Sequence, residues 1–396
     1  MKALKRSMVF CLALILSVAF TMTVAAAPQA ATGFDLKIDG EAVAFDGQTV
    51  VFADGRVLLP LRFLFDSLGG DTIEWIAEER VVVLMNNETE TRLTIDTDVA
   101  LVAGEEVQLD SAAILFNDRT FVPASFLNAL MDVTAHVDAD SQAVLVADNA
   151  RLDHIIELMA AAESVDHPPM SADMITYAQM TMVADGITEE VAMRMTGTMK
   201  LDPANRFQHM SMITEIMGME MASEMYDDGE FLYILMEGMV LRMPSMLDLA
   251  EGFAAQHSPI AGFDIARQYY AGLRLTETAD TFTISGNMII PEYLFTDFFD
   301  SLGGLGDMIP DLDDLDMDME IRFNAPINFT MTIDRATGFL TYMSMDFDME
   351  MDITVDGDSA FMHMVFTTNM PRITYGVEFD TVVPADIVAA AISLDF

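Results

Sequence analysis

Cysteine is almost missing from this sequence, in which Cys11 is the only one among 396 residues. It lies inside an N-terminal segment that we expect to be removed, so the mature chain should have no disulfide, no thiolate metal ligand and no thiol chemistry. Basic side chains are also scarce, because 19 Lys and Arg stand against 64 Asp and Glu and give a net charge of −45. Phosphate backbones are bound by basic patches, and we therefore expect no nucleic acid among the partners.

Recognisable catalytic motifs are missing as well. The sequence has no Gly-x-Ser-x-Gly nucleophile elbow, no His-Glu-x-x-His zinc helix and no phosphate-binding loop. Carboxylates are so frequent that no pair stands out as a general acid and base. We therefore predict a protein that is not an enzyme, with no catalytic residue, no metal site and no cofactor.

The first 26 residues have the three parts of a secretory signal peptide. Lys2, Lys5 and Arg6 precede an apolar run over residues 9–19, and small residues follow at 24–26. Cleavage there predicts a secreted or cell-envelope protein, with a retained membrane anchor as the alternative. We find no second apolar run in the sequence that is long enough for a transmembrane helix.

Residues 54–85 hold the most specific local pattern in the chain. The pattern predicts a strand, a helix and a hairpin, because each segment carries residues suited to it. The signals are, in order, Gly55 in a turn, an extended segment from Arg56 to Leu59, Pro60 at the helix start, a helical face of Leu61, Leu64, Phe65 and Leu68, Gly69 at the helix end, and strands over 72–75 and 80–85.

A second copy of this pattern follows at an offset of 63 residues. Arg119 corresponds to Arg56 and Pro123 to Pro60, and after a one-residue deletion Val137 falls on Trp75. Tandem copies predict one domain over residues 33–148, with repeats at about 34–97 and 98–148.

The two copies together resemble the copper amine oxidase N-terminal-like domain, a stalk module common in secreted bacterial proteins. The matching residues of the first copy are Gly55, Arg56, Leu59, Pro60, Arg62, Leu68, Gly69 and Trp75. The second copy departs from the pattern, with Ser125 in place of the second arginine and Val137 in place of the tryptophan. The resemblance implies an α+β scaffold, and the catalytic domain of that family has no counterpart in this sequence.

The motif residues of this domain are expected to be structural. We predict that Arg56, Arg62 and Arg119 anchor the turn and the start of the helix rather than bind a ligand. Trp75 is expected to be a core residue.

Composition changes sharply at residue 170. Residues 149–169 are predicted as a helical linker, with a helix over 151–165 and a break at His167-Pro168-Pro169. Of the 35 methionines, 29 lie between Met170 and Met370, and many alternate with polar residues. Period two places the apolar set on one face of a sheet. We therefore predict a large antiparallel sheet over residues 170–396, interrupted by helices at about 246–256, 263–275 and 292–302.

This half of the chain resembles the lipoprotein-carrier half-barrels of the LolA and LppX-like superfamily. The resemblance rests on the layout and on the segment from Tyr226 to Tyr233, which is followed by Met243-Pro244. It implies a curved sheet that cups helices and can hold an acyl chain or an apolar peptide on its concave face. The candidate lining residues are Met343, Met345, Phe347, Met349, Met351, Met210 and Met212.

The predicted fold class is therefore α+β, with tandem strand–helix–hairpin repeats followed by a large curved antiparallel sheet, the half-barrel, that cups a few helices. The function that fits best is non-enzymatic binding of a lipid or hydrophobic peptide. An envelope scaffold or adhesion module without a small ligand is the first alternative. The oligomeric state and any association with the cell wall are left open.

A metal binder that uses methionine and carboxylate is the second alternative. Thioether is a soft ligand suited to Cu(I), and both His209 and His363 stand beside methionines. Neighbouring residues of a strand face opposite sides of the sheet, however, which argues against sites shared by these histidines and methionines. The acidic run over 311–320 lacks the glycine and the spaced glutamate of a calcium loop, and we favour a solvated loop.

Overall fold

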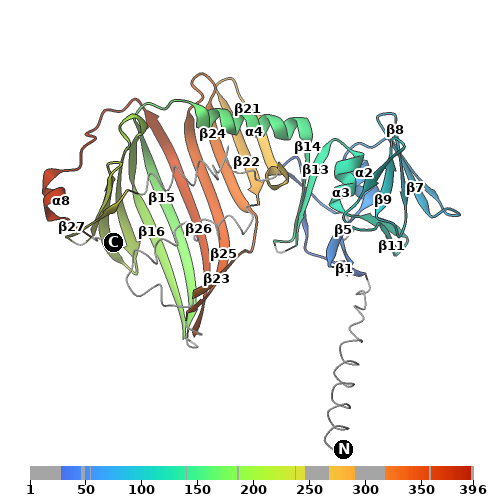
Figure 1. The fold of residues 1–396 in the computed structure, drawn as a ribbon, viewed down its shortest axis with the longest axis horizontal. Coiled ribbons are helices and arrows are strands. Elements are labelled where there is room, and N and C mark those ends of the chain that lie inside the picture. The colour runs from blue at the N-terminus through green and yellow to red at the C-terminus, as the bar shows by residue number, and fades with distance from the viewer. Residues whose placement is uncertain are drawn as a thin grey trace, which may run out of the picture. The chain divides into compact units, whose positions relative to one another are not determined.

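The computed structural model describes residues 28–45, 50–53, 55–139, 141–184, 187–236, 238–245, 267–289, 317–355 and 358–393. The predicted signal peptide, the helices expected at 246–256 and 292–302, and most of the acidic run lie outside these ranges. Strands dominate the described part (Figure 1). None of its helices is long and apolar enough to cross a membrane.

The chain folds into two compact units. The first comprises Met1–Gly33 and Asp46–Phe126, and the second comprises Phe34–Phe45 and Leu127–Phe396. The chain therefore passes between the units three times. This division by packing differs from the division expected from the sequence at residues 34–45 and 127–148, and the domain limits given above stay a prediction.

Two five-stranded antiparallel sheets form the first unit. The first sheet has, in spatial order, β1 (Gln29–Ala31), β4 (Val50–Ala53), β5 (Arg56–Pro60), β12 (Arg119–Val122) and β11 (Ile114–Phe116). The second sheet has β10 (Glu105–Gln108), β9 (Val99–Val102), β8 (Thr89–Thr94), β7 (Val81–Asn86) and β6 (Thr72–Ile76). Strand β6 is therefore an edge strand, which matters for the position of Trp75.

Helix α2 (Leu61–Ser67) follows β5 directly. Pro60 is the last residue of β5 and the N-cap of α2, a position where its missing N–H costs nothing. The fully buried residues of the helix are Leu61, Leu64 and Phe65, at the spacing of one helical face. Gly69 follows the helix with a φ of 78°, a left-handed conformation that glycine adopts at low cost.

A 13-stranded sheet dominates the second unit and curls as a half-barrel (Figure 1). Its strands, in spatial order, are β21 (Gly272–Glu277), β22 (Thr281–Met288), β24 (Ile327–Asp334), β25 (Leu340–Val355), β26 (Asp358–Tyr375), β15 (Met170–Ala184), β16 (Ile187–Asp202), β17 (Phe207–Ile216), β18 (Met219–Asp227), β19 (Phe231–Met236), β20 (Met239–Pro244) and β27 (Ile392–Ser393), while β23 (Met317–Phe323) also pairs with β25. All pairs are antiparallel except β20 with β27. The predicted large antiparallel sheet is thus confirmed.

A smaller four-stranded sheet also belongs to the second unit. Its order is β13 (Val133–Asp138), β14 (Ala143–Asp148), β2 (Asp35–Ile38) and β3 (Glu41–Val43), and helix α3 (Ala124–Leu130) precedes β13. Strand β2 pairs in parallel with β14. In sequence, β2 comes before the main part of the first unit and β14 comes after it, so the pairing joins two segments that the first unit separates.

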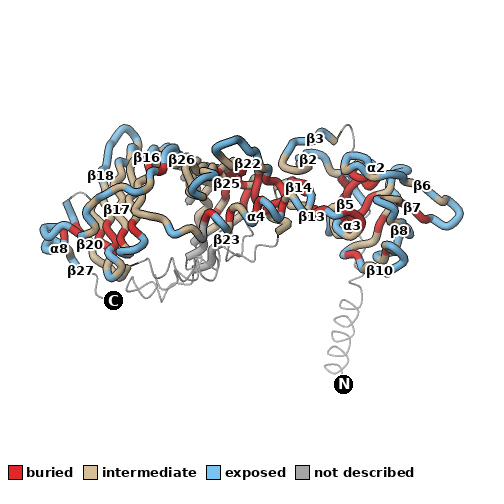
Figure 2. The backbone as a smooth tube through the Cα atoms, turned by 90° about the horizontal axis from the view of Figure 1, so that it is seen from above, coloured by how far each residue is buried: buried red, intermediate tan, exposed pale blue. Residues whose placement is uncertain are grey.

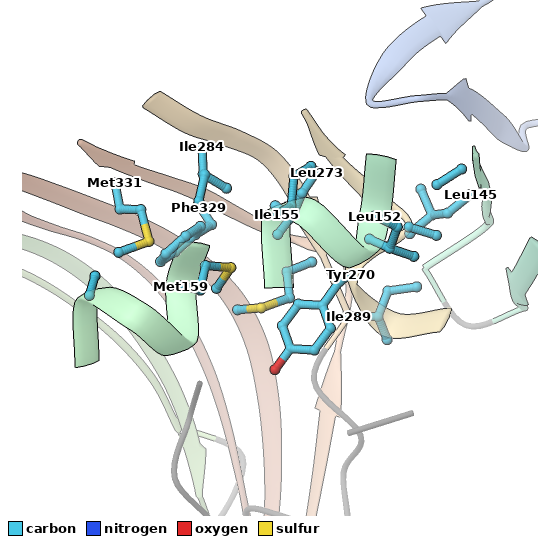
Figure 3. Packing of buried hydrophobic residues seen from close by; sticks show 14 of the residues in the cluster. Leu145, Leu152, Ile155, Met159, Tyr270, Leu273, Ile284, Ile289, Phe329 and Met331 are labelled. Atoms are coloured by element: carbon cyan, nitrogen blue, oxygen red, sulfur yellow. The ribbon is translucent and has the colours of Figure 1, made fainter. Parts of the chain in front are cut away.

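Helix α4 (Asn149–Ser164), expected to be part of a linker, packs on the large sheet. Its N-cap, Asp148, accepts a hydrogen bond from the backbone N–H of Arg151. Leu152, Ile155 and Met159 are buried against β21, β22 and β24 (Figure 3). The helix therefore contributes to the core of the second unit.

The helix expected over 263–275 is wrong for the part that the structure describes. A single 3-10 turn, η2 (Arg267–Tyr270), precedes β21. Gly272 lies so close to the neighbouring strand that a Cβ there would stand 2.4 Å from the carbonyl oxygen of Asn287. Pairing with β22 therefore decides the conformation of this segment. Elsewhere in the sheet a second 3-10 turn, η1 (Pro203–Asn205), links β16 to β17.

Candidate functional site

Cross-strand register gathers the methionines of the central strands on one side of the large sheet, which we call the methionine face. On β25 and β26 the opposed pairs are Met343 with Met370, Met345 with Thr368, Phe347 with Phe366, Met349 with Met364, and Met351 with Met362. The same face continues on β17, where Met210 lies opposite Met199 of β16 and Met225 of β18. The seven residues predicted to line a ligand site therefore share one face.

One end of the methionine face is covered by α4. The buried cluster beneath this helix includes Ile284, Phe329 and Met331, and Met343 and Met345 pack against it (Figure 3). Tyr270 and Ile289 close the cluster at the start of β21 and the end of β22 (Figure 3).

The next part of β25 is also packed. Met349 and Met351 are buried with Phe323 and Ile327. Phe347 stacks on Phe366 with ring centroids 4.6 Å apart. The candidates on β25 therefore belong more to the protein's own core than the sequence alone suggested.

The other end of the methionine face, on β17 to β20, is more exposed. Met219, Met221, Met236 and Met239 are 38–61% exposed. Met236 lies opposite Met239, and Met219 opposite Ile216. The sequence analysis did not select these four methionines as site residues, although the period-two spacing of Met219 and Met221 places that pair on one face. In Figure 2 buried residues gather near the two ends of the sheet, and most of the tube between them has intermediate burial.

The opposite face of the sheet is polar in its middle. At the β17–β20 end it is covered by the C-terminal segment, where Val383 and Ile387 of α8 and its approach pack on Phe207 and Tyr233. Helix α8 spans Ala385–Ala390. The methionine face and its reverse are thus covered at different ends.

The two histidines considered as metal ligands lie on this polar face. His209 stacks on Tyr226 with ring centroids 4.2 Å apart. His363 places its Nε2 atom 2.9 Å from a carboxylate oxygen of Asp348. Within the described residues no three His, Cys, Asp or Glu side chains come together closely enough to hold a metal ion.

Burial favours the uncharged forms of the stacked pair His209 and Tyr226. Desolvation lowers the pKa of His209 from 6.5, opposed by the nearby Glu224 carboxylate. Desolvation, together with the hydrogen bond that its Oη donates to Glu224 at 2.7 Å, raises the pKa of Tyr226 to about 12. Both shifts favour the uncharged form of the ring, which suits a stacked pair that packs against the sheet.

The structure brings several motif residues of the first unit to one pocket of about 530 Å³. Pro60, Arg62, Trp75 and Arg119 all line it. The expectation that Trp75 is a core residue is wrong, because its side chain is 38% exposed. The physical reason is its position on β6, which is an edge strand of the sheet formed by the described residues.

Arg56 lies apart from this pocket. Its Nη1 atom is 2.8 Å from Asp110, and both side chains are about half exposed. The hydroxyl of Ser125 donates to the same carboxylate. Arg56 therefore pairs with Asp110, and its role as an anchor of the turn and of the helix start stays a prediction.

Two motif residues, Gly55 and Pro123, have simple backbone roles. Gly55 has a φ of 76° in the turn before β5. Pro123 is buried immediately before α3, as Pro60 is before α2. These residues shape the backbone and present no functional group.

Family models match both halves of the chain. The copper amine oxidase N-terminal domain matches residues 37–146, which confirms the first resemblance expected from the sequence. A family of unknown function, DUF6612, matches residues 152–391, which is more than half of the chain. A search of the curated proteins found no match.

Several solved structures are similar to part of this chain. LprF from Mycobacterium bovis is 10% identical with a TM-score of 0.23, covering 60% of this chain and 98% of its own. A putative outer membrane lipoprotein-sorting protein domain from Vibrio parahaemolyticus is 11% identical with a TM-score of 0.19, covering 58% and 94%. A DUF1329 family protein from Desulfovibrio piger is 8% identical with a TM-score of 0.18, covering 58% and 95%.

These neighbours include the kind of lipoprotein-sorting protein that the sequence resembles. The extent of the DUF6612 match decides the assignment. The chain therefore belongs to the DUF6612 family of unknown function and carries, ahead of that region, a copper amine oxidase N-terminal domain.

Proposed function

We propose that the protein binds an apolar ligand, an acyl chain or a hydrophobic peptide, on the methionine face of its large sheet. The observation that carries this proposal is the exposure of Met219, Met221, Met236 and Met239 on strands whose reverse side is covered by the C-terminal segment. An exposed group of large apolar side chains marks a surface that contacts something else.

Methionine suits such a surface. Its unbranched thioether side chain adapts to guests of different shape and gains dispersion energy from each of them. The predicted lining residues Met210 and Met212 lie on β17 between the exposed hairpin ends and the middle of the sheet, and both are partly buried. We propose that they line the inner part of the site.

The residues of β25 have a different place in this proposal. Met349 and Met351 are already buried among the protein's own side chains, and Met343 and Met345 pack beside α4. Met343, Met345, Phe347, Met349 and Met351 would therefore form the closed end of the site, against which the ligand stops.

The proposal also covers the location of the protein, the absence of catalysis and the origin of the two similar segments. The protein would be secreted or held in the cell envelope, as the N-terminal sequence suggests. It would act without catalysis. The segments 56–86 and 119–148 would be tandem copies of one unit, which the shared order of strand, helix and two strands supports.

A fluorescent fatty acid titrated into the purified full-length chain tests the proposal. We expect saturable binding, weakened about tenfold or more in the double variant Met210→Gln and Met212→Gln, because an amide buried without a partner costs about 1–3 kcal/mol. The matched control is Ser211→Gln with Ile213→Gln, two residues of the same strand that face the other side.

Two outcomes would contradict the proposal. Absence of saturable binding would leave a scaffold without a small ligand as the better description. Equal weakening in the Met210–Met212 variant and in its control would place the ligand elsewhere on the chain. Circular dichroism of each variant verifies that the fold is retained.

A further inference from the structure

The pocket of the first unit has the size and composition of a small-molecule site. Its volume of about 530 Å³ falls in the range of roughly 300–1,000 Å³ that such sites occupy. Helix α2 supplies one wall, the edge strand β6 a second, and β12 with its preceding turn a third. The residues that define its chemistry are Arg62, Asp66, Glu74, Trp75, Asp118 and Arg119.

Trp75 gives this pocket an accessible aromatic surface. Its indole is 38% exposed, whereas Val82, directly opposite on β7, is buried. Leu115 adds a second exposed apolar side chain to the lining. An indole on an edge strand offers a flat apolar face to a ligand and a polar N–H at its rim.

The polar groups around Trp75 have hydrogen-bonding capacity to spare. Among the described residues, the guanidinium of Arg62 and the carboxylates of Asp66 and Glu74 form no hydrogen bond or ion pair with the protein. A guanidinium only donates hydrogen bonds, and a carboxylate only accepts them. A ligand that satisfies both must carry groups that donate and accept.

Charge narrows the choice of ligand further. Two arginines and three carboxylates line the pocket, so opposite charges nearly balance there. A phosphate or carboxylate ligand would be repelled by the like charges of Asp66, Glu74 and Asp118. An ammonium ligand would be repelled by Arg62 and Arg119. A neutral ligand avoids both penalties.

From these observations we infer that this pocket binds a saccharide, with one sugar ring lying on Trp75 and its hydroxyls paired with Arg62, Asp66 and Glu74. A sugar hydroxyl both donates and accepts, so it can satisfy a guanidinium and a carboxylate at once. The less polar C–H face of the ring covers the indole and removes apolar surface from water. This site is separate in its residues and its ligand from the methionine face.

Trp75 makes the inference easy to test, because it is the only tryptophan of the chain. Its fluorescence in the purified full-length protein reports on this pocket alone. The probes are chitotetraose, cellotetraose and maltotetraose at millimolar concentrations, with inorganic phosphate and tetramethylammonium as the charged comparisons. We expect a saturable change in emission with at least one tetrasaccharide and none with the two ions.

Variants locate the binding. Arg62→Ala and Glu74→Gln keep the tryptophan and should each weaken saccharide binding about tenfold, as expected when a charged hydrogen-bonding partner is lost. Arg80→Ala is the matched control, since Arg80 is a surface arginine of the same unit that pairs with Asp96 outside the pocket. Calorimetric titration of Trp75→Ala, which has no tryptophan signal, should show no binding.

Several results would overturn the inference. One is the absence of a saturable response to all three tetrasaccharides. A second is saturable binding of phosphate or tetramethylammonium in their place. A third is that the Arg62→Ala and Glu74→Gln variants bind the saccharide as strongly as the control variant Arg80→Ala. Each variant's circular dichroism spectrum must match that of the parent protein, and failure of fatty-acid binding would not bear on this site.

Discussion

The two stretches that look alike in sequence, 56–86 and 119–148, have different surroundings in the structure. Strands β5 and β12 begin the stretches and pair with each other in the first unit. The hairpins that end them then part. Hairpin β6–β7 forms one edge of a five-stranded sheet, whereas β13–β14 joins β2 and β3 in the second unit.

Residues at corresponding positions consequently differ in burial and in structural role between the two stretches. Leu145 on β14 is buried in the core that α4 covers, whereas its counterpart Val83 on β7 is only partly buried. Trp75 on β6 stands at a pocket, whereas its counterpart Val137, on the edge strand β13 of the smaller sheet, pairs with Val144 and is partly buried. A local pattern specifies an element, and the partners of that element decide whether it becomes core or surface.

The largest expected difference between the stretches is at their second hairpin strand. Leu145→Ala should lower the free energy of unfolding by about 2–5 kcal/mol, because it removes a fully buried side chain from a packed core. Val83→Ala should cost less than half as much. Denaturant unfolding followed by circular dichroism measures both, and equal losses would mean that the two hairpins are packed alike.

A smaller loss of stability is expected when Trp75 of the first stretch is replaced by valine, the residue at the corresponding position of the second. Trp75→Val should reduce stability by about 1–2 kcal/mol, since the indole is 38% exposed and loses only part of a buried surface. The same denaturant experiment checks this. A loss as large as that of Leu145→Ala would show that Trp75 is a core residue after all.

Protonation should affect the second stretch through His136. Its ring lies 4.9 Å from that of Tyr269, and desolvation lowers its pKa from 6.5, partly offset by Asp138. The unfolded chain therefore takes up this proton more readily than the folded protein, and stability should fall as the pH drops below about 6.5.

Thermal unfolding between neutral and mildly acidic pH measures this effect. His136→Phe should flatten the fall in melting temperature, and His154→Phe, at an exposed histidine of α4, is the matched control. An unchanged slope in His136→Phe would assign the pH dependence to other groups.

The smallest effect is expected at Arg56. Its ion pair with Asp110 is half exposed, and such pairs contribute about 0–1 kcal/mol. Arg56→Ala should therefore shift the melting temperature only slightly, and added salt should hide even that shift. A loss above 2 kcal/mol would restore the structural anchor that the sequence first suggested.

Much of the local structure could be predicted from the sequence. The period-two methionines predicted a large antiparallel sheet, and the spacing of Leu61, Leu64 and Phe65 predicted the buried face of α2. Both predictions depend on neighbours a few residues apart. The strand at 272–277 was missed because pairing with β22 overrides the local pattern there.

The candidate sites could be predicted only in part, because they depend on contacts between distant segments. Which methionines are exposed depends on α4 covering one end of the methionine face and on the C-terminal segment packing on the reverse face, and neither position can be read from the strands themselves. Trp75 and Arg62 stood out in the sequence as motif residues. They meet Glu74 and Arg119 at a pocket because β6 and β12, which belong to different sheets of the first unit, both contribute to its lining.

The three passages of the chain between the two units have a consequence for how the protein breaks. A single proteolytic cut at one passage leaves two covalent connections intact, so digestion should give nicked molecules before it gives separate pieces. Neither unit is one continuous stretch of the chain. The parallel pairing of β2 with β14 means that a truncation beginning at residue 149 removes strands from the very unit it aims to isolate. Joining residue 45 directly to residue 127 is the deletion that respects this connectivity.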